Sequence, residues 1–274
     1  MERTERAWDI ARASWRVLVS HPALLVVAIV ATVVSALVAV GIAGGGYLLV
    51  RPEEPWYELP GGAMWPFYGL ALVVSGWISL VGKGAIVVGA AARMDGREPD
   101  LGVMSAAVRE RNRELWTWAL LTGIVGTVLE LVRERLGVVG NWLSFLGSLA
   151  FSVVSFLALP AIMFEGRGAI AGLRRSTQLL RRSWGENVTF NFAMGGLLLL
   201  VLGPVAVGGG LAASAGVIPL AAALGGTMAL FVVLFGFLEA LTAVFQTALY
   251  RWTQDLPTGP AFSDQQLHAA FDLR

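Results

Sequence analysis

The sequence contains no cysteine, only two histidines and few charged residues. The lack of cysteine excludes disulfide bonds, thiolate metal sites, iron–sulfur clusters and cysteine nucleophiles. The two histidines, His21 and His268, lie near opposite ends of the chain, which argues against a histidine-based metal site or catalytic triad. No Walker loop, dinucleotide fingerprint, nucleophile elbow or metalloprotease helix is present. We therefore expect no enzyme activity and no cofactor.

Apolar sequence is what the chain has in excess. Hydrophobic residues make up 56% of its 274 residues and charged residues 14%, whereas a soluble globular domain carries roughly 25% charged residues. The 52 residues from 187 to 238 include no formal charge, and about 20 apolar residues already span a bilayer. This composition predicts an integral membrane protein.

Apolar runs separated by polar or glycine- and proline-rich segments predict an all-α fold with six transmembrane helices. The long uncharged run is divided at residues 208–219 (GGGLAASAGVIP), where glycine and proline favour a turn. The predicted spans are residues 23–48, 66–92, 115–132, 139–164, 188–207 and 219–250. Residues 1–250 are thus expected to form a single polytopic membrane domain, and residues 251–274 a polar cytoplasmic tail.

The basic residues are distributed unevenly between the two ends of the predicted spans. Sixteen of the twenty Lys and Arg residues fall in the N-terminal segment, in residues 93–113 and 167–182, and in the tail, and three fall in the opposite loops. The positive-inside rule therefore places both termini in the cytoplasm. We expect a multi-pass protein of the plasma membrane.

Three basic segments, residues 1–22, 94–115 and 165–188, have amphipathic patterns that predict cytoplasmic helices at the membrane interface. Each segment precedes a predicted pair of spans, and residues 95–97 (DGR) resemble residues 165–167 (EGR). This pattern indicates a possible threefold repeat of an interfacial helix followed by a helical hairpin. The alternative is that any multi-span protein places basic residues and tryptophan at its inner boundary, because the cytoplasmic leaflet favours them there.

Two stretches, FEGRGAIAGLRRSTQLLRRSWGENV and SWRVLVSHPALL, resemble a family of six-span prokaryotic integral membrane proteins that is described only as a domain of unknown function. That family is loosely similar to the membrane domain of glycerophosphodiester phosphodiesterases. The resemblance covers roughly residues 5–250 and implies the six-span fold and a prokaryotic membrane. The chain has no soluble catalytic domain, so the resemblance implies no phosphodiesterase activity.

Of the three charges inside predicted spans, Glu130 lies near the end of the third span and close to Arg133, as an ordinary interfacial residue does, whereas Lys83 in the second span and Glu239 in the sixth lie deeper. Each costs about 2.5–3.5 kcal/mol on insertion scales, so such residues usually have a role. At about 1.5 Å per residue, Lys83 lies about 15 Å from Arg93 and Glu239 about 18 Å from Arg251. The similar depth predicts an ion pair between the two spans. A structural pair, an ion relay or binding site, and a Lys83 that snorkels to the interface without meeting Glu239 all remain open.

Two further sets of polar residues are candidates for function. Serines at three- and four-residue spacing in the fourth predicted span could line a polar path, but such a stripe more often allows close helix packing. Arginines of the third basic segment are expected to contact anionic lipid headgroups in preference to nucleic acid. The serines are Ser144, Ser148, Ser152 and Ser155, and the arginines are Arg174, Arg175, Arg181 and Arg182.

Two functions are compatible with these features. The first is a non-catalytic membrane scaffold or assembly factor with a basic cytoplasmic surface, which acts with a protein partner or as a homo-oligomer. The alternative is a small transporter or channel in which Lys83, Glu239 and the serines surround a polar cavity. The space around the ion pair distinguishes them: a tightly packed pair favours the scaffold, and a water-sized path favours the transporter.

Overall fold

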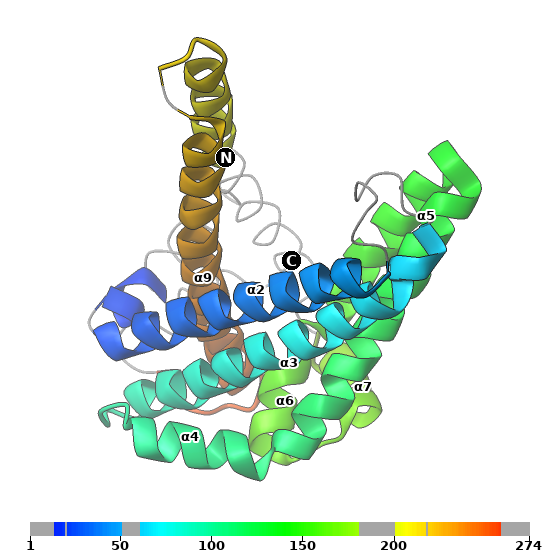
Figure 1. The fold of residues 1–274 in the computed structure, drawn as a ribbon. Coiled ribbons are helices and arrows are strands. Elements are labelled where there is room, and N and C mark those ends of the chain that lie inside the picture. The colour runs from blue at the N-terminus through cyan, green and yellow to red at the C-terminus, as the bar shows by residue number, and fades with distance from the viewer. Residues whose placement is uncertain (1–13, 20, 51–60, 181–200, 218, 259–274) are drawn as a thin grey trace, which may run out of the picture.

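A computed structural model describes residues 14–19, 21–50, 61–180, 201–217 and 219–258, and every secondary-structure element in these ranges is a helix (Figure 1). Four of these helices are long and apolar enough to cross a membrane. A helix satisfies its backbone hydrogen bonds internally, which is the requirement for a chain segment surrounded by lipid. The all-α prediction for the described part of the chain is confirmed.

Helices α2 (Pro22–Val50) and α3 (Gly61–Met94) form an antiparallel pair. Small residues line their contact: a Cβ atom added at Gly82 would lie 2.3 Å from the Ala31 Cβ. The Ser35 hydroxyl also donates a hydrogen bond of 2.8 Å to the Ser75 carbonyl oxygen across the pair. Glycine and alanine allow the two backbones to approach closely where lipid supplies no hydrophobic drive for association.

The short helix α4 (Leu101–Glu110) lies across the C-terminal end of α3 (Figure 1). The end of the molecule at which α3 and α9 (Leu220–Thr253) finish is called the inner end below. Its first turn is capped by Asp100, whose side-chain oxygen accepts a hydrogen bond of 3.0 Å from the Val103 backbone N–H. Met104 and Val108 are buried against the helix bundle, whereas Arg109 is exposed. The second basic segment thus contains an amphipathic helix, whose position at a membrane interface stays a prediction.

Helix α5 (Asn112–Ser155) folds back on itself at Gly137, where φ is +54° and ψ is −125°. The Ser144 hydroxyl donates a hydrogen bond of 2.9 Å to the Leu129 carbonyl oxygen, and the Trp118 and Phe151 rings stack with centroids 6.3 Å apart. These contacts join the two halves in antiparallel order. Glycine tolerates the positive φ of the reversal without the steric penalty of a Cβ atom.

Two short helices, α6 (Ala158–Glu165) and α7 (Ala169–Leu180), follow α5 and pack against each other. Residues Ala158–Met163 of α6 are all buried. The buried hydroxyl of Ser176 on α7 accepts a hydrogen bond of 3.0 Å from the Leu157 backbone N–H just before α6. Ile170 on α7 faces outward and is 64% exposed, so only part of the apolar pattern of this segment is used for internal packing.

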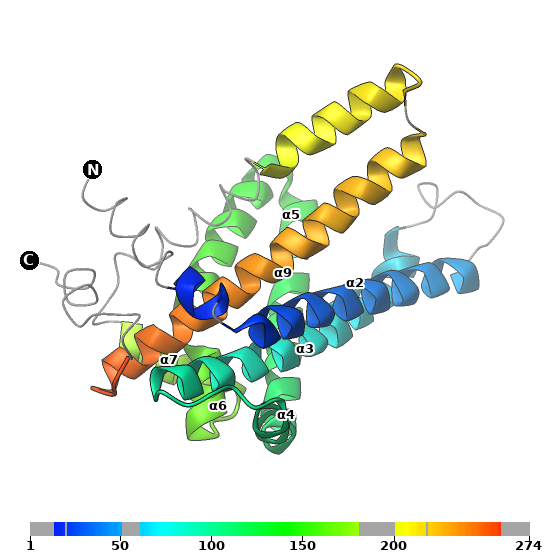
Figure 2. The ribbon, with the colours of Figure 1, turned by 90° about the vertical axis from the view of Figure 1, so that its left-hand side faces the viewer.

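The helix Val201–Ser214 and α9 (Leu220–Thr253) lie side by side (Figure 2). A turn with Gly216 at φ +72° connects them. The helix continues through residues 208–210, so the reversal occupies only the last part of the predicted break at residues 208–219. Residues 188–200 of the predicted fifth span lie outside the described residues.

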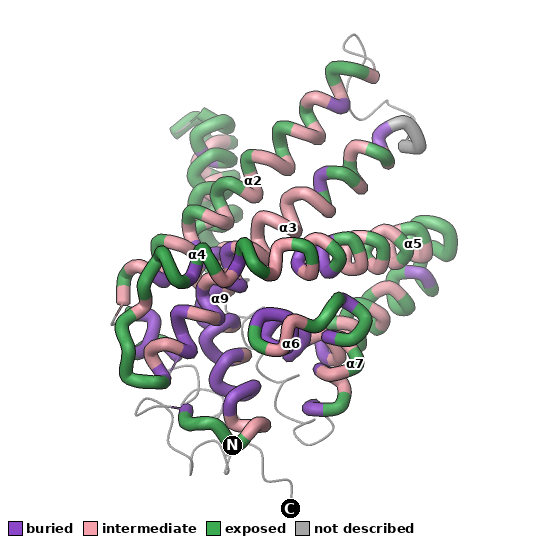
Figure 3. Tube along the Cα trace, turned by 90° about the horizontal axis from the view of Figure 1, so that it is seen from below, coloured by how far each residue is buried: buried purple, intermediate pink, exposed green. Residues whose placement is uncertain are grey.

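The best-packed region is the inner half of the molecule, where α3, α6, α7 and α9 meet (Figure 3). Most of the residues between 240 and 251 of α9 are buried there. Toward the outer ends the helices carry exposed apolar side chains such as Leu37 and Leu49. This distribution suits a membrane protein, because lipid can cover apolar outer surfaces at no cost in hydration.

Candidate functional site

Lys83 on α3 and Glu239 on α9 meet within the long apolar helices. The Lys83 Nζ contacts the Glu239 Oε2, and the two side chains are 27% and 20% exposed. Lys83 lies about 16 Å from the inner end of α3, and Glu239 about 21 Å from that of α9, at about 1.5 Å per residue. The ion pair is therefore far from either of these helix ends.

A glycine near each charged residue allows α2 to pack closely against both α3 and α9. A Cβ atom at Gly82 would collide with Ala31 of α2, and one at Gly236 would lie 2.9 Å from the Thr32 Oγ1 of the same helix. Helix α2 thus approaches both charged helices closely at the level of the ion pair. This contact of α2 with both helices places Lys83 and Glu239 opposite each other.

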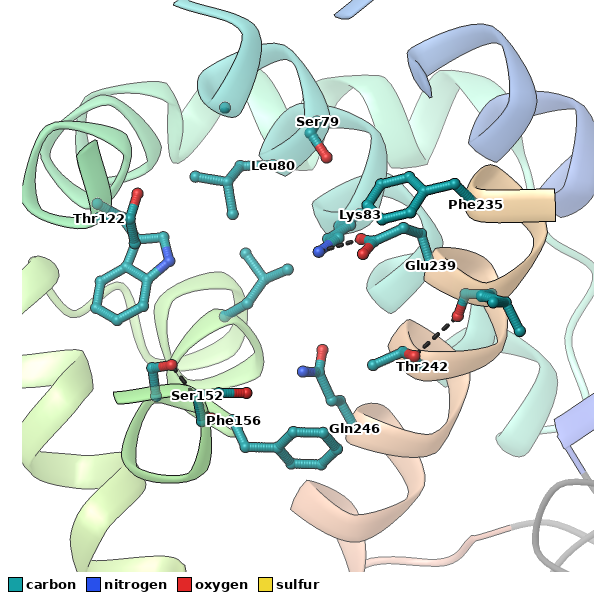
Figure 4. Close-up of a pocket in the computed structure, with 15 residues that line it drawn as sticks. Ser79, Leu80, Lys83, Thr122, Ser152, Phe156, Phe235, Glu239, Thr242 and Gln246 are labelled. Atoms are coloured by element: carbon teal, nitrogen blue, oxygen red, sulfur yellow. Dashed lines mark hydrogen bonds and ion pairs between the residues drawn. The ribbon is translucent and has the colours of Figure 1, made fainter. Parts of the chain in front are cut away.

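The ion pair lines a partly open cavity of about 460 Å³ between α3, α5 and α9 (Figure 4). This volume falls in the range of about 300–1,000 Å³ that is typical of small-molecule sites. Trp118, Phe156 and Phe235 supply aromatic walls. The polar part of the lining consists of Ser79, Lys83, Thr122, Ser152, Ser155, Glu239, Thr242 and Gln246. We call this space the polar cavity.

The two charged groups have hydrogen-bonding capacity that the described residues leave unused. A lysine ammonium has three N–H donors and a carboxylate has two acceptor oxygens, yet within the described part of the chain the polar contact of each group is the one with the other. The Glu239 Oε2 is buried and makes no further hydrogen bond with the described residues. Among the described residues the pair is therefore satisfied in charge but keeps hydrogen-bonding capacity that a ligand could use.

The four serines of the predicted stripe have different roles. Ser152 and Ser155 line the polar cavity. Ser144 instead donates its hydrogen bond within the α5 hairpin, and Ser148 is exposed outside the cavity lining. Ser144 thus serves packing of the hairpin, and the inner part of the stripe supplies polar groups to the cavity.

A second group of charges lies at the inner end of α9. Two consecutive residues there, Tyr250 and Arg251, contact the turns that contain Glu165 and Asp95. The Tyr250 hydroxyl donates a hydrogen bond of 2.8 Å to the Glu165 Oε1. Arg251, whose residue is 8% exposed, contacts the Asp95 carboxylate and donates a hydrogen bond of 2.7 Å from its Nε to the Pro257 carbonyl oxygen. We call Asp95, Glu165, Arg175, Tyr250 and Arg251 the inner-end network.

The network links groups that are far apart in the sequence. Arg175 donates one hydrogen bond of 2.9 Å to Glu165 and another of 3.1 Å to the Gln254 side chain. Burial alone would raise the pKa of Asp95, but hydrogen bonds from Arg97 and Arg251 outweigh burial and lower that pKa below its usual value. Each charge in this network has several partners.

The two acid–glycine–arginine turns have the same local structure. Gly96 and Gly166 both adopt positive φ, at 74° and 63°, and each ends a helix in the left-handed conformation that glycine favours. In each turn the arginine also binds the acid two residues before it. The resemblance between residues 95–97 and 165–167 therefore extends from sequence to conformation.

The arginines expected at lipid headgroups differ in their exposure and in their partners within the protein. Arg174 is exposed on α7, whereas Arg175 is only 25% exposed at its side chain and binds Glu165 and Gln254. Much of the donor capacity of Arg175 is thus used inside the protein. Arg181 and Arg182 lie outside the described residues.

Several lining residues were not predicted from the sequence although their spacing carried a signal. Ser79 lies four residues before Lys83, and Phe235 lies four residues before Glu239, so each shares a helix face with a charge. Thr242 lies three residues after Glu239 on that face as well. Thr122 and Trp118 carried no such signal, because α5 contains no charge at cavity depth. Arg251 was assigned to the tail, although no turn-forming residue separates it from the span before it.

Within the described residues, no group of three or more His, Cys, Asp or Glu side chains could hold a metal ion. The long apolar helices instead define the class of the molecule as a multi-pass membrane protein with a polar cavity between its helices.

Residues 66–260 match a family of unknown function, DUF6159, and the chain belongs to that family. The matched range contains Lys83, Glu239 and the other described residues that line the polar cavity. The expected membership of an uncharacterised family is confirmed. Comparisons with curated proteins and with solved structures found no match.

Proposed function

We propose that this protein is a small transporter that binds a small polar solute at Lys83 and Glu239. The observation that carries the proposal is that an ion pair within the apolar helices borders a polar cavity of about 460 Å³. A purely structural pair is most stable when further hydrogen bonds satisfy both charges and no space remains beside them. Here the polar cavity and the unused hydrogen-bonding groups lie beside the same ion pair.

The proposed membrane arrangement has six spans with both termini in the cytoplasm of a prokaryote. The reversal of α5 at Gly137 and the packing of the helix Val201–Ser214 beside α9 support three helical hairpins. The two similar acid–glycine–arginine turns support a repeated hairpin unit. We include in this proposal a loose similarity to the membrane domain of glycerophosphodiester phosphodiesterases, which concerns the membrane-spanning part alone. No catalysed reaction is involved.

A scaffold with a protein partner or a second copy of the chain is the second candidate, and the inner-end network favours it. Multiple hydrogen bonds tie α6, α7 and α9 together at the inner end, which suits a surface that must keep its shape. Exposed arginines near that end, Arg109, Arg113 and Arg174, would attract anionic lipid headgroups. Co-purification of one protein in fixed stoichiometry from mild detergent would favour this candidate.

Swelling of proteoliposomes under iso-osmotic solute gradients tests transport of several chemically different solutes side by side. Wild-type protein should admit at least one small polar solute, among glycerol, urea, glycine and sodium lactate, faster than protein-free vesicles. The Lys83→Met/Glu239→Leu variant, inserted at equal density, should lose that increment. If no solute enters faster than it enters protein-free vesicles, the transporter proposal is contradicted.

A further inference from the structure

The polar cavity has an unusual charge balance. Among the described residues that line it, only Lys83 and Glu239 carry formal charges, and these charges are opposite and in contact. The remaining polar lining consists of hydroxyl groups and the Gln246 amide. The site is therefore neutral as a whole but contains one strong cationic donor and one strong anionic acceptor.

This balance restricts which ligands can bind. A simple anion that takes Lys83 away from Glu239 leaves an unpaired carboxylate among apolar helices, and a simple cation at Glu239 leaves an unpaired ammonium. An uncompensated buried charge is strongly unfavourable. A ligand that carries both charges avoids the penalty, because each protein charge exchanges its partner for one on the ligand.

We propose that the polar cavity binds a small zwitterion, with the anionic oxygens of the ligand on Lys83 and its ammonium group on Glu239. This inference rests on the proposed function of the same site and names its ligand class. A free amino acid and the phosphoethanolamine headgroup of a lipid share this chemistry. Both present an ammonium and an anionic oxygen a few bonds apart.

The surroundings of the pair fit such a ligand. The hydroxyls of Thr122 and Thr242 donate to carbonyl oxygens of their own helices, at 3.0 Å to Ala119 and 2.8 Å to Leu238. Their oxygens therefore keep lone pairs that can accept from an ammonium group.

Gln246 points into the same space as the ion pair (Figure 4) and offers both a donor and an acceptor. The flexible stems of lysine and glutamate allow the pair to separate into the cavity and admit the ligand.

A set of ligands with one skeleton tests the inference in purified wild-type protein. Glycine carries both charges, glycinamide lacks the carboxylate, and N-acetylglycine lacks the ammonium. We expect glycine at saturating concentration to raise the midpoint of thermal unfolding by about 2–4 °C, and the two single-charge relatives to leave it unchanged. Addition of phosphatidylethanolamine, with phosphatidylglycerol as the headgroup that lacks an ammonium, distinguishes a lipid source from a free solute.

Variants separate specific binding from general effects. Lys83→Met and Glu239→Gln should each abolish the shift, whereas Arg133→Met, which breaks the exposed ion pair with Glu130, should preserve it.

If N-acetylglycine or glycinamide alone produces the full shift, the zwitterion inference is overturned while binding at the cavity stands. If no ligand shifts the midpoint and no solute enters the proteoliposomes, the ligand class and the proposed function fail together.

Discussion

Oppositely charged side chains meet in two regions of the protein, and the two regions differ in how many hydrogen-bond partners each charge has. In the inner-end network, Glu165 accepts hydrogen bonds from Arg175 and Tyr250 as well as a contact from Arg167. In the polar cavity, Lys83 and Glu239 have only each other among the described residues, with open space beside them. Charged groups whose hydrogen-bonding capacity is fully used stabilise a structure, whereas charged groups with unused capacity beside a cavity remain available to a ligand.

The packing around the two regions supports the same distinction. Residues of α9 near the network are almost continuously buried. Glu239 lies at the border where α9 leaves this packed region and its outer residues become exposed. The network therefore holds the helices at a fixed inner end, and the cavity lies where the helices are less constrained by one another.

The largest stability loss is expected from removal of the buried arginine of the network. Arg251→Ala leaves Asp95 without its interhelical partner and should reduce the free energy of unfolding by about 3 kcal/mol, the lower end of the range for a broken buried pair because Asp95 is partly exposed. Denaturant titration in detergent micelles measures this loss. Arg97→Ala is the matched control, since Arg97 binds the same carboxylate from a 69% exposed position, and its effect should stay below about 1 kcal/mol. Equal losses in both variants would contradict the assigned role of Arg251.

The turn that presents Glu165 to the network should be the next most sensitive position. Gly166 has φ +63°, so Gly166→Ala should cost about 1–2 kcal/mol, the penalty for a Cβ atom in the left-handed conformation. Gly168→Ala is a suitable control, because nothing lies within 4 Å of a Cβ atom there and its φ is not in the left-handed region. The same denaturant titration compares them, and a Gly168→Ala loss as large as that of Gly166→Ala would argue against backbone strain.

A smaller effect is expected from the protonation of Asp95. The pKa of this carboxyl is lowered in the folded protein, so its contribution to stability is present above the ordinary aspartate pKa of about 3.9. The contribution is lost as the pH falls through the lower folded-state pKa. The stability difference between wild type and Asp95→Asn should therefore narrow below about pH 4. Thermal unfolding midpoints from pH 6 to pH 3 test this, and a constant difference across that range would contradict it.

The sequence predicted the helical class of the described residues, because long apolar runs are a local signal. The similar depth of Lys83 and Glu239 predicted that they would meet, and the two side chains are in contact. The sequence allowed a polar cavity around this pair as one alternative but could not decide whether it exists, because the cavity depends on the distance of α5 from α3 and α9. The inner-end network was missed for a related reason: Tyr250 and Arg251 bind turns 85 and 156 residues away, and no local pattern identifies such partners.

The central claim is that Lys83 and Glu239 serve binding and contribute little to stability. Replacing a buried ion pair by apolar residues of similar volume is often neutral or stabilising, so Lys83→Met/Glu239→Leu should unfold at or above the wild-type midpoint. The decisive measurement is solute entry into proteoliposomes by this double variant, reconstituted at the same density as the wild type. We predict that it keeps its stability and loses solute entry; a folded double variant that admits solutes at the wild-type rate would contradict the account.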